Sequence, residues 1–454
     1  MTLAVDRPIV PEQPAPPESR EWPLPSSLRP DLIGLQAAHP QRYPGLFLSS
    51  GDSGWDMLFA FPQDIVRVTA AGGLNALQSH PAMQLQPTSG TLPDLPFSGG
   101  WLCAFAYELG GLFEPTVGQD VDDAGFPLAW LVRIPAAILF DRTNGRCVLL
   151  AEAGQASLLD RMQRDLDELP PPLPALPELR SLNEDEPAAF LAGVSRIQEY
   201  IRAGDVFQVN LSRGWRAEFA TPIPAAPLLG RLMQKNPAPF SALLQMDEWA
   251  IVSSSPERLV RLDPTGRLET RPIAGTHPRS DDATEDAALR ARLQAHPKER
   301  SEHVMLVDLE RNDLGRVCDP GSVKVEALME TTSYRHVHHI ESTVCGQLRQ
   351  GMRVYDALRA VFPGGTITGC PKVRTMQIIR ELEQTPRRSY TGSVGYINRD
   401  GSFDFNILIR SFLLRGNELS FRAGAGIVAD SVAARELDET RAKARGLLRA
   451  LESP

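Results

Sequence analysis

The sequence predicts an α+β fold in which antiparallel sheets carry helices on their outer faces. Strand-like segments follow one another through short connections at 207–219, 241–246, 250–255 and 258–262, and again at 392–397, 405–414 and 418–428. Short connections favour antiparallel pairing of neighbouring strands. Helical patterns lie between these groups, at about 187–203, 295–312 and 354–362, from Pro371, and from near Ser431 to the end of the chain.

Composition bounds the function. The chain has 454 residues, 42% of them hydrophobic, which is enough for two or three domains or one large unit of enzyme size. Its formal charge of −9 argues against a general nucleic-acid or membrane-surface binder, because phosphate binding needs a basic face. An anionic substrate would therefore need a local basic pocket.

Proline-rich stretches divide the chain. Residues 1–29 read as a flexible leader and not as a signal peptide, because they lack an apolar core. A second proline cluster at 169–186 reads as a linker between an N-terminal part, 30–168, and a C-terminal part, 187–454. Five cysteines without CxxC spacing favour reduced thiols in a cytoplasmic protein, and no apolar run is long enough to span a membrane.

Two helices carry paired glutamates, Glu299 with Glu302 and Glu436 with Glu439. Residues three apart share a helix face, so each pair presents two carboxylates to one side. If the helices face each other, the four carboxylates need a hard cation such as Mg²⁺ between them. The alternative is two solvated helix faces.

Two glycine-rich stretches could bind an anion. Residues 421–431 run from a strand through Gly424 and Gly426 to a helix that Asp430 or Ser431 can cap. Residues 362–372 are similar and offer Lys372, although they lack the ending of a phosphate-binding loop. Tight strand ends and turns are the alternative for both.

Further side chains could act in chemistry. His338 and His339 can titrate near neutral pH, or fill the core. Glu257 follows a strand at a proline, where burial can raise a carboxyl pKa for general-acid work; a surface glutamate is the alternative. Arg410 lies in an apolar strand and needs a carboxylate partner, either from a ligand or from the protein's own structure. Residues 269–280, with small Ala274 and Gly275 at the centre, suggest a close backbone approach to a ligand or to another strand.

Several long motifs in order resemble the chorismate-utilising enzymes, in particular component I of aminodeoxychorismate synthase and of anthranilate synthase. The resemblance covers about 190–450 and, more loosely, the N-terminal third; it is carried by FQVNLSR, SSSPERL, TRPIAGT, ERSEHVMLVDLERNDLGRV, VHHIEST, FPGGTITGCPK, GSVGY and AGAGIVADS…DETRAKA. It implies the component I fold, with the sheets packed as a sandwich and the two parts intertwined as one unit.

The resemblance also implies roles for residues. Glu302 and Glu439 match Mg²⁺ ligands, supported by Glu299 and Glu436. Glu257 matches the general acid that protonates the departing C4 hydroxyl. Thr276 and His339 match further catalytic residues, which line the enolpyruvyl and departing-hydroxyl region. The residues that match the substrate-binding set are Tyr390, Arg410, Gly426 and Lys443 at the enolpyruvyl carboxylate, with Gln208, Gly424, Ala274, Gly275 and Lys372.

Gln208 bears on which nucleophile, water or ammonia, the resemblance implies. Hydrolytic relatives carry a water-activating lysine at this position, so a neutral amide implies ammonia instead. None of the cysteines lies in a glutaminase nucleophile elbow. The resemblance therefore implies a separate glutamine amidotransferase subunit, component II, that supplies ammonia, and a PLP-dependent lyase downstream.

Ala274 bears on the product. Many aminodeoxychorismate synthases have a lysine here, whereas anthranilate synthases have alanine and add ammonia directly at C2. Against this, anthranilate synthases usually carry a Leu-Leu-Glu-Ser feedback element, and the matching stretch LFLSSG (46–51) lacks the glutamate. The sequence favours 4-amino-4-deoxychorismate, the precursor of 4-aminobenzoate and folate, with anthranilate and pyruvate for tryptophan synthesis as the alternative.

Overall fold

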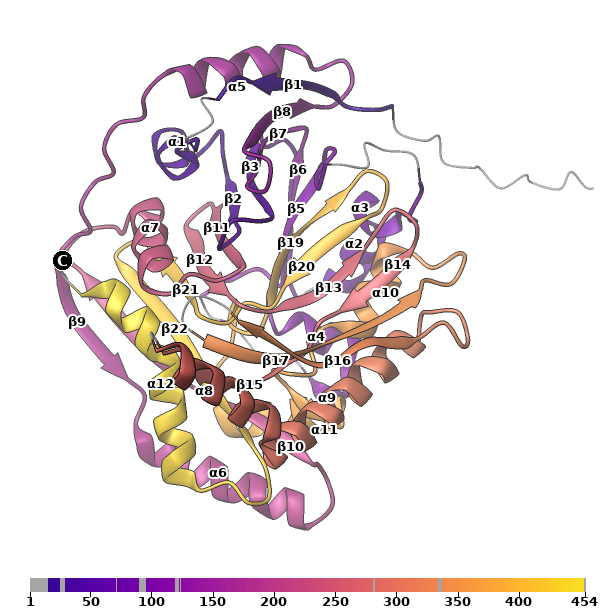
Figure 1. The fold of residues 1–454 in the computed structure, drawn as a ribbon, viewed down its shortest axis with the longest axis vertical. Coiled ribbons are helices and arrows are strands. Elements are labelled where there is room, and N and C mark those ends of the chain that lie inside the picture. Colours follow the sequence, from indigo (N-terminus) through magenta and orange to yellow (C-terminus); the bar gives the residue numbers. More distant parts are fainter. Residues whose placement is uncertain are drawn as a thin grey trace, which may run out of the picture.

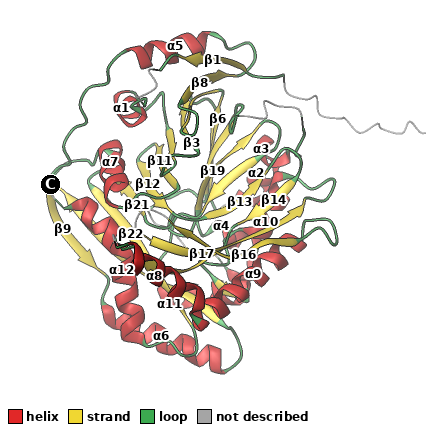
Figure 2. Ribbon diagram, viewed as in Figure 1, coloured by secondary structure: helices red, strands yellow, loops and turns green. Residues whose placement is uncertain are grey.

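Two large antiparallel sheets with helices on their outer sides make up the protein (Figures 1 and 2), which confirms the predicted α+β class. The structure is a computed structural model that describes residues 15–24, 29–70, 72–89, 95–118, 122, 124–280, 282–333 and 337–452. Both sheets combine strands from the N-terminal and C-terminal parts of the chain.

The first sheet has the strand order β1-β8-β7-β3-β2-β11-β12-β21-β22-β10-β18, and β9 pairs with β10. The register joins distant segments, since Leu46 lies opposite Leu243 and Asn210 opposite Gly426. Its strands are β1 (Glu18–Trp22), β2 (Gly45–Leu48), β3 (Trp55–Ala60), β7 (Ala136–Asp141), β8 (Arg146–Ala151), β9 (Leu179–Glu184), β10 (Gln208–Phe219), β11 (Phe240–Met246), β12 (Trp249–Ser255), β18 (Gly369–Cys370), β21 (Ser411–Arg415) and β22 (Glu418–Ile427).

The second sheet has the order β15-β17-β14-β13-β20-β19-β5-β6-β4, and β16 pairs with β17. Again an N-terminal strand joins a C-terminal one, because Phe105 lies opposite Ser393. Its strands are β4 (Ile65–Val68), β5 (Gly100–Phe105), β6 (Ala129–Ile134), β13 (Arg258–Leu262), β14 (Arg267–Thr270), β15 (Ile273–Pro278), β16 (Lys324–Ser333), β17 (Val337–Gln347), β19 (Ser393–Asn398) and β20 (Phe403–Asn406).

Helices surround the sheets (Figure 2). Two of them, α9 and α12, line a cavity between the edges of the two sheets with their first turns and run along the outside of the molecule. The helices are α1 (Leu32–Ala38), α2 (Gly73–Ser79), α3 (Pro81–Gln84), α4 (Leu109–Phe113), the 3-10 turn η1 (Pro115–Val117), α5 (Ser157–Asp167), α6 (Pro187–Arg202), α7 (Ala225–Lys235), α8 (Ala283–Ala295), α9 (Pro297–Gly315), α10 (Val354–Val361), α11 (Lys372–Glu383) and α12 (Ala433–Leu451).

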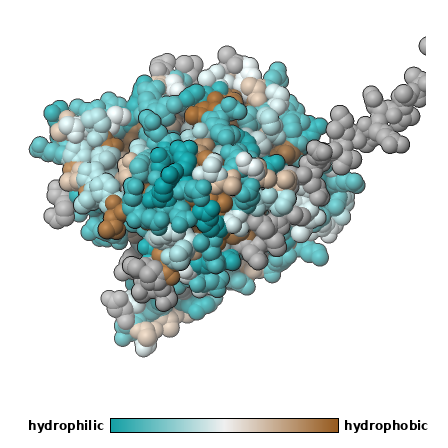
Figure 3. All heavy atoms as spheres, turned by 90° about the horizontal axis from the view of Figure 1, so that it is seen from above, coloured by the Kyte–Doolittle hydropathy of each residue, from teal (hydrophilic) through white to brown (hydrophobic). Residues whose placement is uncertain are grey.

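The hydrophobic core has three parts. One lies between the sheets and takes side chains from both, among them Phe59 of β3 and Val394 of β19. A second joins the first sheet to α1, α5, α7 and α12, and a third joins the second sheet and β10 to α6, α9, α10 and α11. Burial on both faces explains why strands such as β7 are apolar over most of their length, here over residues 136–140. The face seen in Figure 3 is mostly hydrophilic, with small separate hydrophobic patches.

Short strands occur inside the segments predicted as leader and linker. β1 pairs with β8, and β9 pairs with β10. Their sequences, ESREW and LRSLNE, are polar, as befits strands with little core to cover. The sequence did not reveal these strands. They are flanked by prolines, and they are stabilised by partners that lie far away in the sequence.

The segment predicted as one strand at 405–414 is two strands in different sheets. The chain leaves β20 at Asn406, crosses to the first sheet, and enters β21 at Ser411. Arg410 therefore lies in the crossing and not in a strand, with a φ of +54°. In the crossing, Ile407 and Leu408 are buried and Ile409 is partly buried, so its apolar composition resembles that of a core strand.

Helix boundaries also differ from the prediction. α8 was not predicted, because its apolar residues, mostly alanines, do not gather on one face of the helix. α11 begins one residue after Pro371, and α12 begins at Ala433 with Val432 as its N-cap. The expected cap from Asp430 or Ser431 is not formed; the Ser431 hydroxyl accepts instead from the Val428 N–H at 3.1 Å.

A buried ionic cluster ties α11 to β10 and β22. The Glu383 carboxylate accepts hydrogen bonds from Arg387 at 2.6 and 3.0 Å, from Arg422 at 3.0 Å, and from the Ser212 N–H and hydroxyl at 2.8 Å. Burial raises the Glu383 pKa, but the two guanidinium groups outweigh it, and the pKa lies below its usual value. The carboxylate is therefore charged and compensates two buried cations.

We expect Glu383→Gln to lower the free energy of unfolding by about 3–5 kcal/mol, because it leaves buried positive charge without compensation. Urea unfolding followed by tryptophan fluorescence measures the change. The matched control is Glu248→Gln, which breaks the exposed pair with Arg415 and should cost at most about 1 kcal/mol. Equal losses in the two variants would contradict the prediction.

Candidate active site

A cavity of about 500 Å³ brings together nearly all of the residues singled out in the sequence. β10 and β22 form one wall, α9 and α12 form the second, and β15, β17 and the crossing at Arg410 form the third. The predicted residues that line it are Gln208, Glu257, Ala274, Gly275, Glu299, Glu302, His339, Tyr390, Arg410, Gly424, Gly426, Glu436, Glu439 and Lys443.

The four glutamates of α9 and α12 all line this cavity, and the charges of Glu299 and Glu439 act on Glu302; the region around these three residues is the acidic end of the cavity. Burial raises the pKa of Glu302, and the neighbouring carboxylates of Glu299 and Glu439 add to the rise. Gln208 Nε2 donates to Glu302 Oε1 at 2.7 Å, and Lys443 Nζ lies 2.7 Å from Glu439 Oε1. The end of the cavity is thus strongly acidic, and one amide and one ammonium partly offset it.

The donor chemistry at this end suits Mg²⁺, which prefers carboxylate oxygens. Within the described residues, however, no three acidic, imidazole or thiol side chains are arranged as a preformed metal site. Glu302 and Glu439 are engaged by Gln208 and Lys443. A cation would replace these contacts, and it would remove the repulsion that raises the Glu302 pKa.

Glu257 is a buried carboxyl that follows β12 and Pro256, the position in which the sequence suggested burial. Burial raises its pKa to about 7, against the opposing effects of Thr366, the Ile273 N–H and the Arg410 charge. The side chain lines the cavity with only 5% of its surface exposed. It is therefore able to hold a proton near neutral pH and to release it into the cavity.

Arg410 provides a buried positive charge facing the same cavity. Burial lowers its pKa, and the nearby Tyr390, Glu257 and Glu439 oppose the effect. Its guanidinium makes no hydrogen bond within the described part of the chain. The carboxylate partner expected for this arginine is thus a group that a ligand can supply.

His339 is neutral at physiological pH. Burial lowers its pKa to about 4, and its Nδ1–H donates to the Gly275 carbonyl at 3.2 Å. His338 points elsewhere and binds Asp286 and Ser333, at 2.9 and 2.8 Å. Of the two histidines, only His339 lines the cavity.

Gly275 explains the small residues at 269–280. Its φ is +66°, and a Cβ built on it would lie 3.0 Å from Glu299 Oε2 and 2.8 Å from Leu293 of α8. The close approach is therefore to the acidic end of the cavity and to α8. Ala274 beside it is 7% exposed and lines the cavity.

Two predicted residues differ from the rest. Lys372 is not among the residues that line the cavity, because its Nζ binds Asp313 Oδ2 at 2.5 Å and the Val361 carbonyl at 2.9 Å. Its position in a glycine-rich stretch suggested that Lys372 would bind an anionic ligand. Instead it binds a carboxylate of the protein itself, that of Asp313 on α9. Thr276 lies in β15 opposite His339, and its side chain falls outside the described part of the structure.

Several lining residues were missed. They are Asn210, Asn236, Thr366 and Arg422. A signal existed for Asn210, because it is two residues from Gln208 on one strand and so shares its face. The other three reach the cavity only through tertiary packing.

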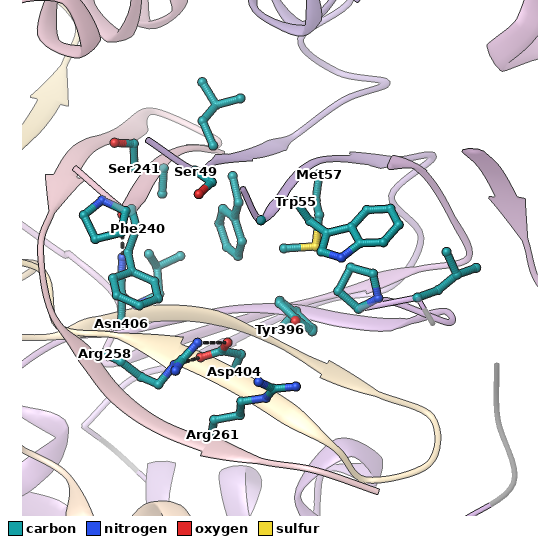
Figure 4. A pocket seen from close by; sticks show the side chains of 18 residues that line it. Ser49, Trp55, Met57, Phe240, Ser241, Arg258, Arg261, Tyr396, Asp404 and Asn406 are labelled. Carbon is teal, nitrogen blue, oxygen red and sulfur yellow. Dashed lines mark hydrogen bonds and ion pairs between the residues drawn. The ribbon is translucent and has the colours of Figure 1, made fainter. Parts of the chain in front are cut away.

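A second cavity of about 420 Å³ lies between the sheets, where residues 47–49 and 55–57 meet Phe240, Tyr396 and Asn406 (Figure 4). Arg258 binds Asp404 across its floor at 2.9 and 3.0 Å, and Asn406 donates to the Phe240 carbonyl at 3.2 Å. Leu48 and Ser49 of the stretch LFLSSG line it. The stretch LFLSSG therefore lines this cavity and not the acidic one.

Comparisons with known proteins agree on one family. A model described as chorismate binding enzyme matches residues 45–449. Anthranilate synthase component 1 of Thermus thermophilus is 41% identical over 374 residues, with 79% of each chain covered. Aminodeoxychorismate synthase component 1 of Bacillus subtilis is 40% identical over 380 residues, covering 80% of this chain and 79% of that one.

Among solved structures, anthranilate synthase component I from Streptococcus pneumoniae superposes with a TM-score of 0.77 at 30% identity. The match covers 88% of this chain and 93% of that one. The predicted component I fold is confirmed. No helix in the described part of the chain has the length and apolar character needed to cross a bilayer.

Proposed function

The chain belongs to the chorismate binding enzyme family, and from this premise we propose that it aminates chorismate with ammonia to give 4-amino-4-deoxychorismate. The observation that carries the amination is Gln208. Its neutral amide forms part of the cavity wall and is hydrogen-bonded to Glu302, at the position where water-using relatives are expected to have a lysine. An amide cannot deprotonate water, so the nucleophile must arrive already reactive, as ammonia does.

The residues divide the work of the reaction. The ammonia nitrogen forms a bond to ring carbon C4, and the C4 hydroxyl leaves with its electron pair and takes the proton of Glu257. The bonded nitrogen then gives up its extra proton, which restores the acid form of Glu257. Chorismate and ammonia thus give aminodeoxychorismate and water. The raised pKa of Glu257 supports this role, because the carboxyl holds a proton at a pH where an exposed glutamate would not.

A dianionic substrate needs positive charge on both of its carboxylates. We propose that Arg410, Tyr390 and Lys443, which line the cavity, hold the enolpyruvyl carboxylate, with His339 and Gly275 also lining the cavity beside them. We propose that Glu302 and Glu439, supported by Glu299 and Glu436, hold Mg²⁺ for the ring carboxylate. When bound, Mg²⁺ supplies positive charge that offsets the cost of placing an anion among glutamates.

Ammonia requires a source and the product a consumer. The similar chains named component 1 support a partner component II, which we propose to be a glutamine amidotransferase subunit. A PLP-dependent lyase would then convert the product to 4-aminobenzoate.

A second candidate is formation of anthranilate and pyruvate, and Ala274 favours it. Its methyl group lines the cavity where a lysine nucleophile would otherwise stand, so ammonia has direct access to C2. Because position 274 holds alanine and not a lysine nucleophile, aminodeoxychorismate synthesis needs another way to direct nitrogen to C4. The serine in place of glutamate at the second cavity favours the first candidate, because it lacks the feedback element of anthranilate synthases.

The product decides between them. We expect the purified chain, incubated with chorismate, Mg²⁺ and ammonium at alkaline pH, to form a species that retains the enolpyruvyl group. Mass spectrometry and conversion to 4-aminobenzoate by an added lyase identify it. Fluorescent anthranilate released with an equivalent of pyruvate would establish the second candidate instead, and isochorismate formed without ammonium would refute amination altogether.

A further inference from the structure

Two amide side chains project into the active-site cavity from one face of β10. Gln208 and Asn210 are two residues apart and so point to the same side of the strand. Each occupies the space above a glycine of β22. A Cβ on Gly426 would overlap the Gln208 amide, and a Cβ on Gly424 would lie 2.6 Å from Asn210 Oδ1. These glycines therefore make room for the amides.

Both amide oxygens, Gln208 Oε1 and Asn210 Oδ1, are buried and have no hydrogen-bond partner in the described part of the structure. Gln208 is oriented by its bond to Glu302. The Asn210 backbone is held on both sides, since its N–H donates to the Thr368 carbonyl and its carbonyl accepts from Arg387, each at 2.8 Å. Its side-chain amide has no such bond. An unpaired buried acceptor destabilises a fold by about 1–3 kcal/mol, unless a ligand supplies the missing hydrogen bond.

The two oxygens can accept hydrogen bonds from N–H or O–H groups. They could also bind a hard cation, but the carboxylates of α9 and α12 are the ligands proposed for that. The carboxylates of chorismate are excluded, because they would be repelled by amide oxygens and have Arg410, Tyr390 and Lys443 to bind. Ammonia fits, because it has three N–H groups and one lone pair. Two acceptors on one strand face can take two of its hydrogens and leave the lone pair directed into the cavity.

We propose that Asn210, together with Gln208, binds the ammonia nucleophile and orients its lone pair toward the ring. The proposal rests on the amination proposed above, and it applies to attack at either ring carbon. Asn210 is the new residue in it: its amide contributes a hydrogen bond to the nitrogen substrate and none to the fold.

The test is Asn210→Leu in the full chain, assayed without a partner subunit and with ammonium chloride as the nitrogen source. Initial rates are measured against ammonia at saturating chorismate, and against chorismate at saturating ammonia. We expect the KM for ammonia to rise about tenfold, the effect of one lost hydrogen bond. The KM for chorismate should stay within about twofold. Thermal unfolding should occur at the same or a higher temperature, because an unpaired buried acceptor is removed.

Asn417→Leu is the matched control. The Asn417 amide donates to the Phe219 carbonyl at 3.2 Å, far from the cavity, so its role is structural. This variant should unfold at a lower temperature and keep both KM values. The two asparagines are therefore expected to show opposite patterns.

Other outcomes overturn the proposal. A tenfold rise confined to the KM for chorismate would mean that Asn210 binds a hydroxyl group of the organic substrate. Unchanged KM values in Asn210→Leu, with a wild type that requires ammonium, would refute this site while leaving amination intact. A wild-type chain that consumes chorismate equally well without ammonium would refute amination itself, and this site with it.

Discussion

Replacing Glu302 or Glu439 by glutamine is expected to abolish chorismate consumption while the fold stays intact. Each change removes one charge of the proposed Mg²⁺ site, and loss of one such electrostatic contact lowers kcat by about 10²–10³. Stopped assays with chorismate, ammonium and varied Mg²⁺ measure the effect. We expect excess Mg²⁺ to restore part of the rate, because a weakened site can still be filled by mass action.

Measuring the free energy of unfolding distinguishes a variant that has lost a metal ligand from a variant that has lost its fold. The Glu302 carboxyl is destabilised by burial and by Glu299 and Glu439, so a neutral amide should leave the free energy of unfolding unchanged or raise it. The control is Glu299→Gln. We expect it to have a smaller effect on the rate, because Glu299 is proposed to support the Mg²⁺ ligands and not to be one of them. Unchanged turnover in both Glu302→Gln and Glu439→Gln would refute the metal assignment.

Glu257→Gln is expected to lower kcat by about 10²–10⁴, the usual contribution of a positioned general acid. The amide keeps the size of the side chain but has no acidic proton for the leaving hydroxyl. KM for chorismate should change little. A variant with wild-type kcat would exclude Glu257 from proton transfer.

The wild-type pH profile provides an independent check. Because burial raises the pKa of Glu257 to about 7, the acid is protonated below that pH and loses its proton above it. With free ammonia held constant by adjusting total ammonium, kcat should fall as pH rises through about 7. The same limb should be absent from the residual activity of Glu257→Gln.

The sequence was most informative where function repeats in local patterns. The i, i+3 spacing of glutamates on α9 and α12 identified the acidic end of the cavity, and the strand-proline context identified Glu257. The sequence failed where partners are far apart along the chain. Lys372 binds a carboxylate of α9, and Arg410 lies in a crossing between sheets that has the composition of a strand. The spacing from Gln208 could have placed Asn210 on the same strand face, but that its amide oxygen is unpaired can be recognised only from the structure.

The pairing of β5 with β19 also sets the order of events during synthesis. Phe105 has Ser393 as its partner, so the N-terminal strand leaves the ribosome long before its neighbour exists. At about 5–20 residues per second, the delay is on the order of tens of seconds. During this time the edges of β2 and β5 are open and apolar, and aggregation competes with folding. We therefore expect nascent chains to need chaperone protection until almost the whole polypeptide has emerged.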